Sequence, residues 1–187
     1  MEKIQIFIDY AGGENPEHTD ILINQLNRLG DNVTVVTYDD ISNEEYAPDD
    51  WERITLDAIN KSKIIIPFLT PFYLDFVSKN IGDKFSQVIN SKDKYLFPIM
   101  IEKSDWSSFN WVVRSQIFPS DESSISEFSD SKVRSLYSNF VSVIKNVINQ
   151  VNTTATSPPI ITPTIKLNKS QFISHAHEDA DLAELLK

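Results

Sequence analysis

The order of apolar segments over the first 150 residues is the feature that most narrowly limits the fold. Lys63 to Leu69 is almost continuously apolar, as in a strand that is buried on both faces. Similar strand-like runs cover residues 4–8, 33–37 and 95–101, and helical periodicity covers 21–29, 51–59, 71–90 and 133–151. This alternation predicts an α/β fold, in which a parallel sheet carries helices on both faces, joined by right-handed crossovers.

Three segments are expected to meet at one edge of this sheet. Ligands of parallel sheets bind at the carboxyl ends of the strands. Asp9 and Tyr10 follow the first expected strand, a polar loop from Tyr38 to Asp50 follows the second, and the segment after Leu69 follows the third. Pro67 and Pro98 fall inside expected strands, where they would mark strand ends or bulges.

Composition excludes several classes of function. The 187 residues carry a formal net charge of -10, which disfavours binding to nucleic acid or to an anionic membrane. The chain has no Cys, which excludes disulfides and thiolate chemistry. We expect no signal peptide, no membrane-spanning helix and a cytoplasmic location, because no basic start precedes a long apolar run.

The composition changes abruptly after the last expected helix. Residues 152–169 are rich in Thr and Pro, with little to bury, and are typical of an extended linker. Residues 170–187 restart with a strand-like run and half of a helix, which cannot bury their own apolar faces. We therefore expect one domain over 1–151, a linker, and the truncated start of a second domain.

Several segments, in order along the chain, resemble the boxes of bacterial Toll/interleukin-1 receptor (TIR) domains, with SEFIR-like features. The matching segments are Ile6–Tyr10, Tyr38–Trp51, Phe68–Leu74, Leu96–Trp106, Gln116–Pro119 and Ile125–Phe128. The restart at Phe172–Ala183 resembles the family's opening box more closely, with Ser174, His175, His177 and Asp179. The resemblance implies that a second TIR-like domain begins there.

The resemblance implies a flavodoxin-like three-layer sandwich with a parallel sheet of four to five strands. It also implies a signalling module that binds other TIR-like domains or a second copy of itself, in immune defence for instance. The loop after the second strand would carry the interaction, through Asp39, Asp40, Ile41, Glu44, Glu45 and Pro48. Asp9, Tyr10 and Trp51 are the candidates for lining a nucleotide cleft, although Trp51 and Trp106 are more often packing residues.

Many TIR-like domains cleave the bond between nicotinamide and ribose in NAD+, and the resemblance places a catalytic Glu on the helix after the third strand. Such a carboxylate stabilises developing oxocarbenium charge. Counting from Ser78, the matching position is Lys84, whose ammonium group cannot take this role. Asp83 could replace the Glu only if the helix register shifted by one residue; otherwise Asp83 and Lys84 are solvated surface charges.

Read alone, His175, His177 and Asp179 also resemble the ligand run of metallo-β-lactamase-like hydrolases. That family expects a further His where this chain has Ala180, and two imidazoles cannot close a zinc site. We therefore expect no metal and no cofactor. Two hypotheses remain: a catalytically degenerate interaction module, or an NAD+ nucleosidase for which NAD+ is the substrate.

Overall fold

A computed structural model describes residues 3–10, 18–41, 51–91, 93–121 and 123–154. These residues contain five short strands, all paired in parallel. The strands are β1 (Ile4–Asp9), β2 (Val33–Thr37), β3 (Ile64–Leu69), β4 (Tyr95–Leu96) and β5 (Ile99–Met100). Hydrogen-bonded neighbours follow the order β2-β1-β3-β4, and β5 also pairs with β3. The expected parallel α/β sheet is confirmed.

β4 and β5 together fill one position beside β3. β4 pairs with the first half of β3, and β5 pairs with Phe68 and Leu69. Ile99 of β5 in turn forms a parallel bridge with Phe118, through Met100 N to Phe118 O (2.7 Å) and Phe118 N to Pro98 O (2.9 Å). The arrangement is the flavodoxin-like strand order, with the fifth position reduced to a single bridge.

The two prolines account for the interruption between β4 and β5. The carbonyls of Ile65 and Leu69 accept bonds from the β4 and β5 side, so the odd-numbered residues of β3 face that neighbour. Pro67 is one of them, and its missing N–H falls where neither β4 nor β5 pairs with β3. Pro67 therefore lies inside an uninterrupted β3, and does not mark the expected strand end or bulge. Pro98, in contrast, lies in the gap between β4 and β5, where pairing with β3 is interrupted.

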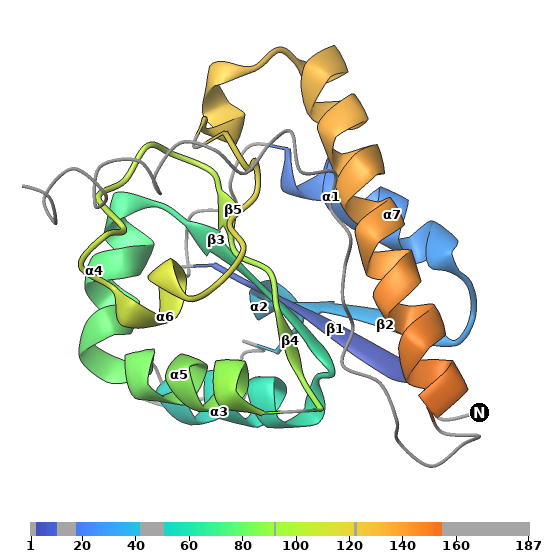
Figure 1. The fold of residues 1–187 in the computed structure, drawn as a ribbon, viewed down its shortest axis with the longest axis horizontal. Helices are drawn as coiled ribbons and strands as arrows, with labels where there is room; N and C mark the ends of the chain where they lie inside the picture. The colour runs from blue at the N-terminus through green and yellow to red at the C-terminus, as the bar shows by residue number, and fades with distance from the viewer. Residues whose placement is uncertain (1–2, 11–17, 42–50, 92, 122, 155–187) are drawn as a thin grey trace, which may run out of the picture. The chain divides into compact units, whose positions relative to one another are not determined.

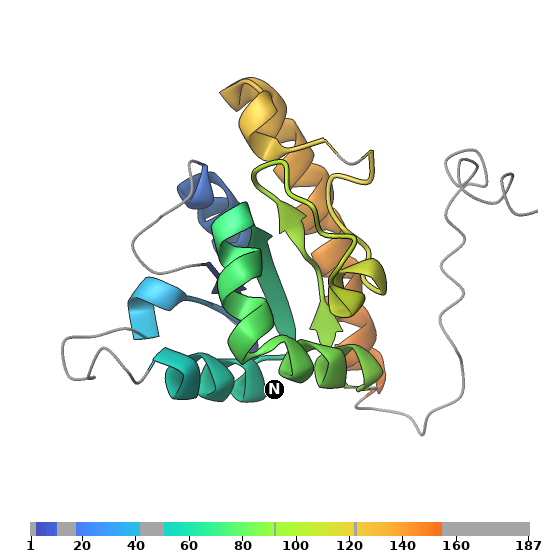
Figure 2. The same ribbon diagram turned by 90° about the vertical axis from the view of Figure 1, so that its left-hand side faces the viewer.

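Helices cover both faces of this sheet, as the alternation predicted (Figures 1 and 2). One face carries α1 (Thr19–Leu26), the 3-10 turn η1 (Asn27–Leu29) and α7 (Asp130–Thr154). The other face carries α3 (Trp51–Lys61), α4 (Pro71–Asn80), α5 (Gly82–Asn90) and α6 (Asn110–Val113). The short α2 (Tyr38–Ile41) follows β2, and the 3-10 turn η3 (Ile125–Glu127) precedes α7.

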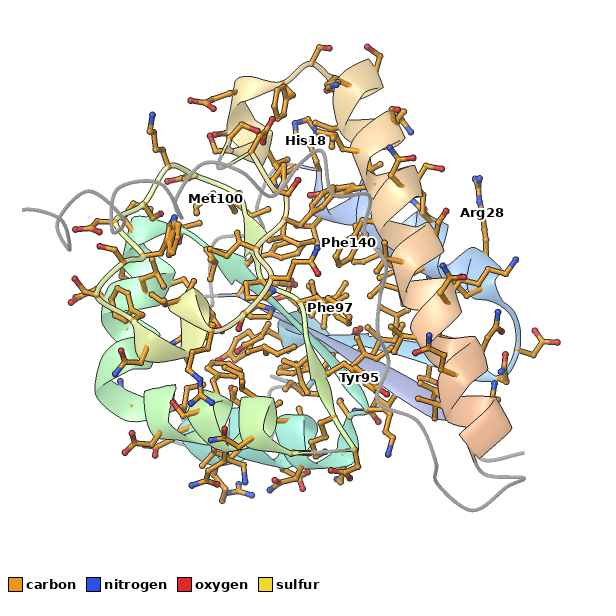
Figure 3. All side chains as sticks on the ribbon, viewed as in Figure 1. His18, Arg28, Tyr95, Phe97, Met100 and Phe140 are labelled. Carbon is orange, nitrogen blue, oxygen red and sulfur yellow. The ribbon has the colours of Figure 1, made fainter. Side chains whose placement is uncertain are left out.

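Alternate side chains of each central strand supply the two cores. Ile4, Ile6 and Ile8 of β1 pack with α1 and α7, whereas Phe7 packs with α3 and α4. Aromatic rings extend the α7 side: Phe97 meets Phe140 edge-on at 6.2 Å and lies parallel to Tyr95 at 6.5 Å. Figure 3 labels these three residues. Alternation along β1 thus directs consecutive residues to different layers.

The segment after β2 departs from the sequence prediction. We expected a loop from Tyr38, but residues 38–41 form the helix α2. Thr37 and Asp40 explain it, because the Asp40 carboxylate accepts from Thr37 N (2.8 Å) and Asp40 N donates to Thr37 Oγ1 (3.3 Å). This reciprocal cap starts a helix immediately after the strand. Residues 42–50 lie outside the described residues.

The helix expected over 71–90 is two helices. α4 ends at Asn80, and Ile81 leaves the helical conformation (φ -124°, ψ 6°) before Gly82 starts α5. Glycine favours such a break because it contributes little helix propensity. The break sets α5 apart from α4, which matters for the placement of Asp83.

α7 is the longest helix and extends three residues into the expected linker. It ends at Thr154, beyond the predicted boundary at 152. The remainder of the expected linker and the start of the second domain lie outside the described residues. Within the described residues, none of the helices combines the length and the apolar character needed to cross a membrane.

Candidate functional site

Several of the domain's buried polar side chains lie at the carboxyl edge of the sheet. Asp9, the last residue of β1, is 3% exposed, and its side chain lies on the α3 and α4 side of the sheet. Tyr73, in the first turn of α4, donates its hydroxyl to Asp9 Oδ2 at 2.7 Å. The parallel register sets Asp9 beside Pro67 of β3. A carboxyl group is therefore held inside the domain by one phenol.

Burial governs the ionisation of this pair. Burial raises the pKa of Asp9 from 3.8 to about 7, although the Tyr73 hydrogen bond opposes the rise. Burial and the Asp9 charge also raise the pKa of Tyr73 well above its ordinary value. Asp9 is thus close to half-ionised at neutral pH while Tyr73 keeps its proton and remains the donor. A carboxyl group that titrates near pH 7 is able to exchange protons in that range.

Tyr10, the next residue, extends from the same strand end to the opposite face. Its ring lies 6.2 Å from that of Phe68 and meets Tyr38 edge-on at 6.4 Å. Burial and a hydrogen bond to the Asp39 carboxylate raise the pKa of Tyr10 to about 12. Asp9 and Tyr10 therefore connect the end of β1 to α4 and to α2, respectively.

Two threonine caps fix the helices that begin at this edge. Thr37 starts α2 as described above, and its hydroxyl also donates to Asp40 (2.8 Å). Thr70 starts α4, because Tyr73 N donates to Thr70 Oγ1 at 3.0 Å and Pro71 occupies the first helical position. The same cap that begins α4 thus positions the phenol that meets Asp9.

Thr55 of α3 adds a buried hydroxyl on the same face of the sheet. It is 1% exposed, and its Oγ1 has no hydrogen-bond partner in the part of the chain that the structure describes. α3 runs opposite to β1, because Ser62, just past its end, accepts a bond from Gln5 Nε2 (3.0 Å). Thr55 lies about 10 Å back along the helix from Ser62, and Asp9 lies about 13 Å along the strand from Gln5. Thr55 is therefore level with the carboxyl half of β1.

The structure brings some of the predicted site residues together. Asp9 and Tyr10 are buried at the carboxyl edge, next to the exposed Asp39 and Asp40 and the half-buried Ile41 of α2. Trp51 starts α3, but its side chain lies outside the described residues. The other predicted residues lie entirely outside them: Glu44, Glu45, Pro48, Ser174, His175, His177 and Asp179.

Asp83 and Lys84 lie away from this edge. Asp83 is exposed in the first turn of α5, and Lys84 beside it is half-buried. The rest of α4, residues 74–80, is about 10 Å long and separates them from the turn that holds Tyr73. Asp83 and Asp9 therefore do not form a pair of carboxyl groups around one ligand.

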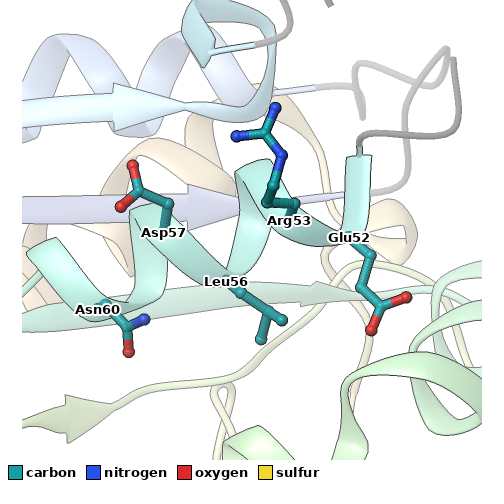
Figure 4. A pocket seen from close by; sticks show the side chains of 5 residues that line it. All are labelled: Glu52, Arg53, Leu56, Asp57 and Asn60. Atoms are coloured by element: carbon teal, nitrogen blue, oxygen red, sulfur yellow. The ribbon is translucent and has the colours of Figure 1, made fainter. Parts of the chain in front are cut away.

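A shallow depression lies elsewhere, along the outer side of α3 (Figure 4). Its lining is Glu52, Arg53, Leu56, Asp57 and Asn60, all from that one helix. Leu56 is half-buried and the other four are exposed. Asp57 pairs with Lys61 at 2.6 Å on the same surface. Side chains of a single exposed helix do not converge on a ligand, so the carboxyl edge is the stronger candidate site.

Among the described residues, no three His, Asp or Glu side chains are grouped so that they could hold a metal ion. Sequence reasoning identified Asp9 and Tyr10 but missed Thr37, Thr55, Thr70 and Tyr73. The Thr-Pro step at 70–71 is a helix-start signal that could have identified Thr70. The contact of Tyr73 with Asp9 depends on tertiary packing and leaves no local signal.

Comparison with known proteins yields no family. No protein-family model matches the chain, and no curated protein matches its sequence. Among solved structures, a conserved protein from Enterococcus faecalis V583 is similar at 11% identity and TM-score 0.42, over 79% of this chain and 98% of that one. A flavone reductase is similar at 15% identity and TM-score 0.39, over 78% of this chain and 64% of that one. Both TM-scores lie below 0.5, so neither protein's activity is transferred to this chain.

Proposed function

We propose that residues 1–151 form a TIR-like interaction module that self-associates or pairs with other TIR-like domains and is itself catalytically degenerate. The separation of Asp83 and Lys84 from the carboxyl edge carries this proposal. Cleavage of the nicotinamide–ribose bond requires a carboxylate beside the bound ribose. The acid nearest to the family's catalytic position instead projects into solvent beyond the far end of α4.

The interaction surface is the segment that begins with α2. Asp39 and Asp40 are exposed there, and both are tied to the sheet, Asp39 through Tyr10 and Asp40 through Thr37. Charges that are held in place by a rigid edge select a partner by electrostatic complementarity. The surface therefore suits a partner with basic side chains at the contact.

The alternative is an NAD+ nucleosidase, in line with the same resemblance. The observation in its favour is Asp9, a buried carboxyl group with a pKa of about 7 at the edge where parallel sheets bind ligands. In this alternative, Asp9 rather than Asp83 would be the acid to test first. Asp9 is 3% exposed, so a nucleotide would have to displace part of the edge to reach it.

Two measurements on the full chain separate these functions. Sedimentation velocity over a hundredfold concentration range is expected to show association that weakens at least tenfold in Asp39→Lys. The exposed Asp105 provides the matched control, because Asp105→Lys changes the same charge on another surface. Incubation with NAD+ is expected to release no nicotinamide. Release that is lost in Asp9→Asn or Asp83→Ala would establish the nucleosidase instead, and a chain that stays monomeric would rule out self-association.

A further inference from the structure

Asp9, the last residue of β1, and Tyr10, which follows it, hold the two helices that start at the carboxyl edge. Asp9 accepts the hydroxyl of Tyr73 from α4, and Tyr10 donates to Asp39 from α2. Both residues are almost completely buried, at 3% and 4% exposure. A change of charge at Asp9 therefore acts on a strand end to which both helices are attached.

The described groups that face Asp9 from α2, α4 and β3 carry no positive charge. From α2, Tyr38 and Asp39 bring a phenol and a carboxylate to this edge, and burial, with the Asp9 charge as a smaller cause, raises the pKa of Tyr38. From α4 the facing group is the phenol of Tyr73, whereas β3 contributes Pro67, which has no charge.

Among the described residues, the remaining neighbours supply no compensating cation. α3 contributes Thr55 on this side, whereas its charged residues Glu52, Arg53, Asp57 and Lys61 are exposed. In the described part of the chain, no Lys, Arg or His forms an ion pair with Asp9. A carboxylate that is buried without a cation costs free energy, which is lowered by protonation or by the entry of water.

We propose that Asp9 is a proton-operated control of the carboxyl edge: neutral Asp9 keeps α2 and α4 fixed to the end of β1, and ionised Asp9 loosens both. The proposal rests on the proposed function in taking this edge as the binding surface. The edge is then ordered below neutral pH and opens above it. Partner binding through Asp39 and Asp40 is expected to strengthen as the pH falls from 8 to 6.

Hydrogen exchange on the full chain tests the control without any partner. The probes are the amides of Asp40, Tyr73 and Leu74, which donate to Thr37 Oγ1, Thr70 Oγ1 and Thr70 O in the first turns of α2 and α4. After correction for intrinsic exchange, their opening equilibrium is expected to increase about tenfold from pH 6 to pH 8. Amides in the middle of α7 are expected to change less than twofold.

Asp9→Asn keeps the shape of the side chain and removes its charge, so the difference between pH 6 and pH 8 is expected to disappear. Glu102→Gln is the matched control, because Glu102 is exposed and its replacement removes one carboxylate without touching Asp9. The proposal is overturned if the wild type shows no difference, or if Asp9→Asn retains it.

A second measurement uses the wild type alone, in case Asp9→Asn does not fold. The carboxyl carbon of Asp9 is followed by NMR between pH 4 and 9, together with the amides of α2 and α4. A shared midpoint near neutral pH supports the control, and an Asp9 midpoint below 5 overturns it. Either result leaves the self-association test unaffected, so the two proposals fail separately.

Discussion

The two ends of the β1–α3 pair differ in how fully their buried polar groups are hydrogen-bonded. At the amino edge of the sheet, Gln5 bonds Ser62, and Lys94 Nζ donates to the carbonyls of Ile59, Asn60 and Ser62 at 3.0, 2.7 and 2.7 Å. At the carboxyl edge, within the described residues, the Asp9 carboxyl group accepts from one phenol and Thr55 Oγ1 has no partner.

This difference indicates that the amino edge is structural, whereas the carboxyl edge is available for function. Lys94 occupies the carbonyls that the end of α3 leaves open, which is the usual requirement of a helix C-terminus. A polar network that is satisfied in this way stabilises the fold, whereas unsatisfied groups cost stability and are tolerated where function needs them. The carboxyl edge is therefore one place where buried polar groups lower the stability of the domain.

Asp9→Asn is expected to give the largest effect and tests this comparison directly. The folded-state pKa of Asp9 is raised from 3.8 to about 7, so its contribution to stability is full below pH 4 and is lost as the pH rises to about 7. At pH 8, the variant is expected to have a free energy of unfolding about 4 kcal/mol higher than that of the wild type. The measurement is urea unfolding at pH 4.5, 6 and 8.

At pH 4.5 the difference is expected to shrink to about 1 kcal/mol, because Asp9 is then neutral in the folded state and only the unfolded chain is ionised. Glu102→Gln is again the control, and its stability should follow that of the wild type at each pH. If Asp9→Asn is destabilised at pH 8, the Asp9 carboxylate is stabilising and the contrast between the two edges is wrong.

Lys94→Met is expected to give the second largest effect, in the opposite direction. The substitution keeps the apolar stem but leaves three carbonyls near the end of α3 without their donor. We expect the free energy of unfolding to fall by about 2 kcal/mol at pH 7. Lys61→Met is the matched control, because the exposed Lys61–Asp57 pair on α3 is worth at most about 0.5 kcal/mol. Equal losses in the two variants would show that the amino edge is not specially stabilised.

The sequence predicted the layers but not the details of the strand ends. Buried parallel strands are apolar runs, so β3 and the alternation of strands and helices could be identified from composition and period. The strand ends depend on specific side-chain hydrogen bonds. For example, α2 begins directly after β2 because Thr37 and Asp40 form a reciprocal cap at its first turn. The fifth sheet position is a bridge at Phe118, too short to give a pattern.

The candidate site could be predicted only where it follows from strand topology. Asp9 and Tyr10 were identified because the carboxyl end of a first strand is the usual ligand edge of a parallel sheet. Tyr73 lies within the TIR-like segment Phe68–Leu74 and was assigned no role, although its hydroxyl meets a residue 64 positions away. Thr55 was missed for the same reason, because its burial depends on how α3 packs on β1. Contacts between distant segments leave no local signal.

Thr55→Val is expected to give the smallest effect. It tests the comparison of the two edges at a single atom, the Thr55 hydroxyl oxygen. Valine keeps the shape of threonine and removes the hydroxyl that has no partner, so the free energy of unfolding is expected to stay constant or rise by up to about 1 kcal/mol. Ser62→Ala at the other end of α3 removes a hydroxyl that accepts from Gln5, and is expected to lose about 1 kcal/mol. Urea unfolding of both variants at pH 6 compares the two edges while Asp9 is largely protonated. A loss in Thr55→Val as large as that in Ser62→Ala would mean that Thr55 is hydrogen-bonded in solution, and the carboxyl edge would then be as fully satisfied as the amino edge apart from Asp9.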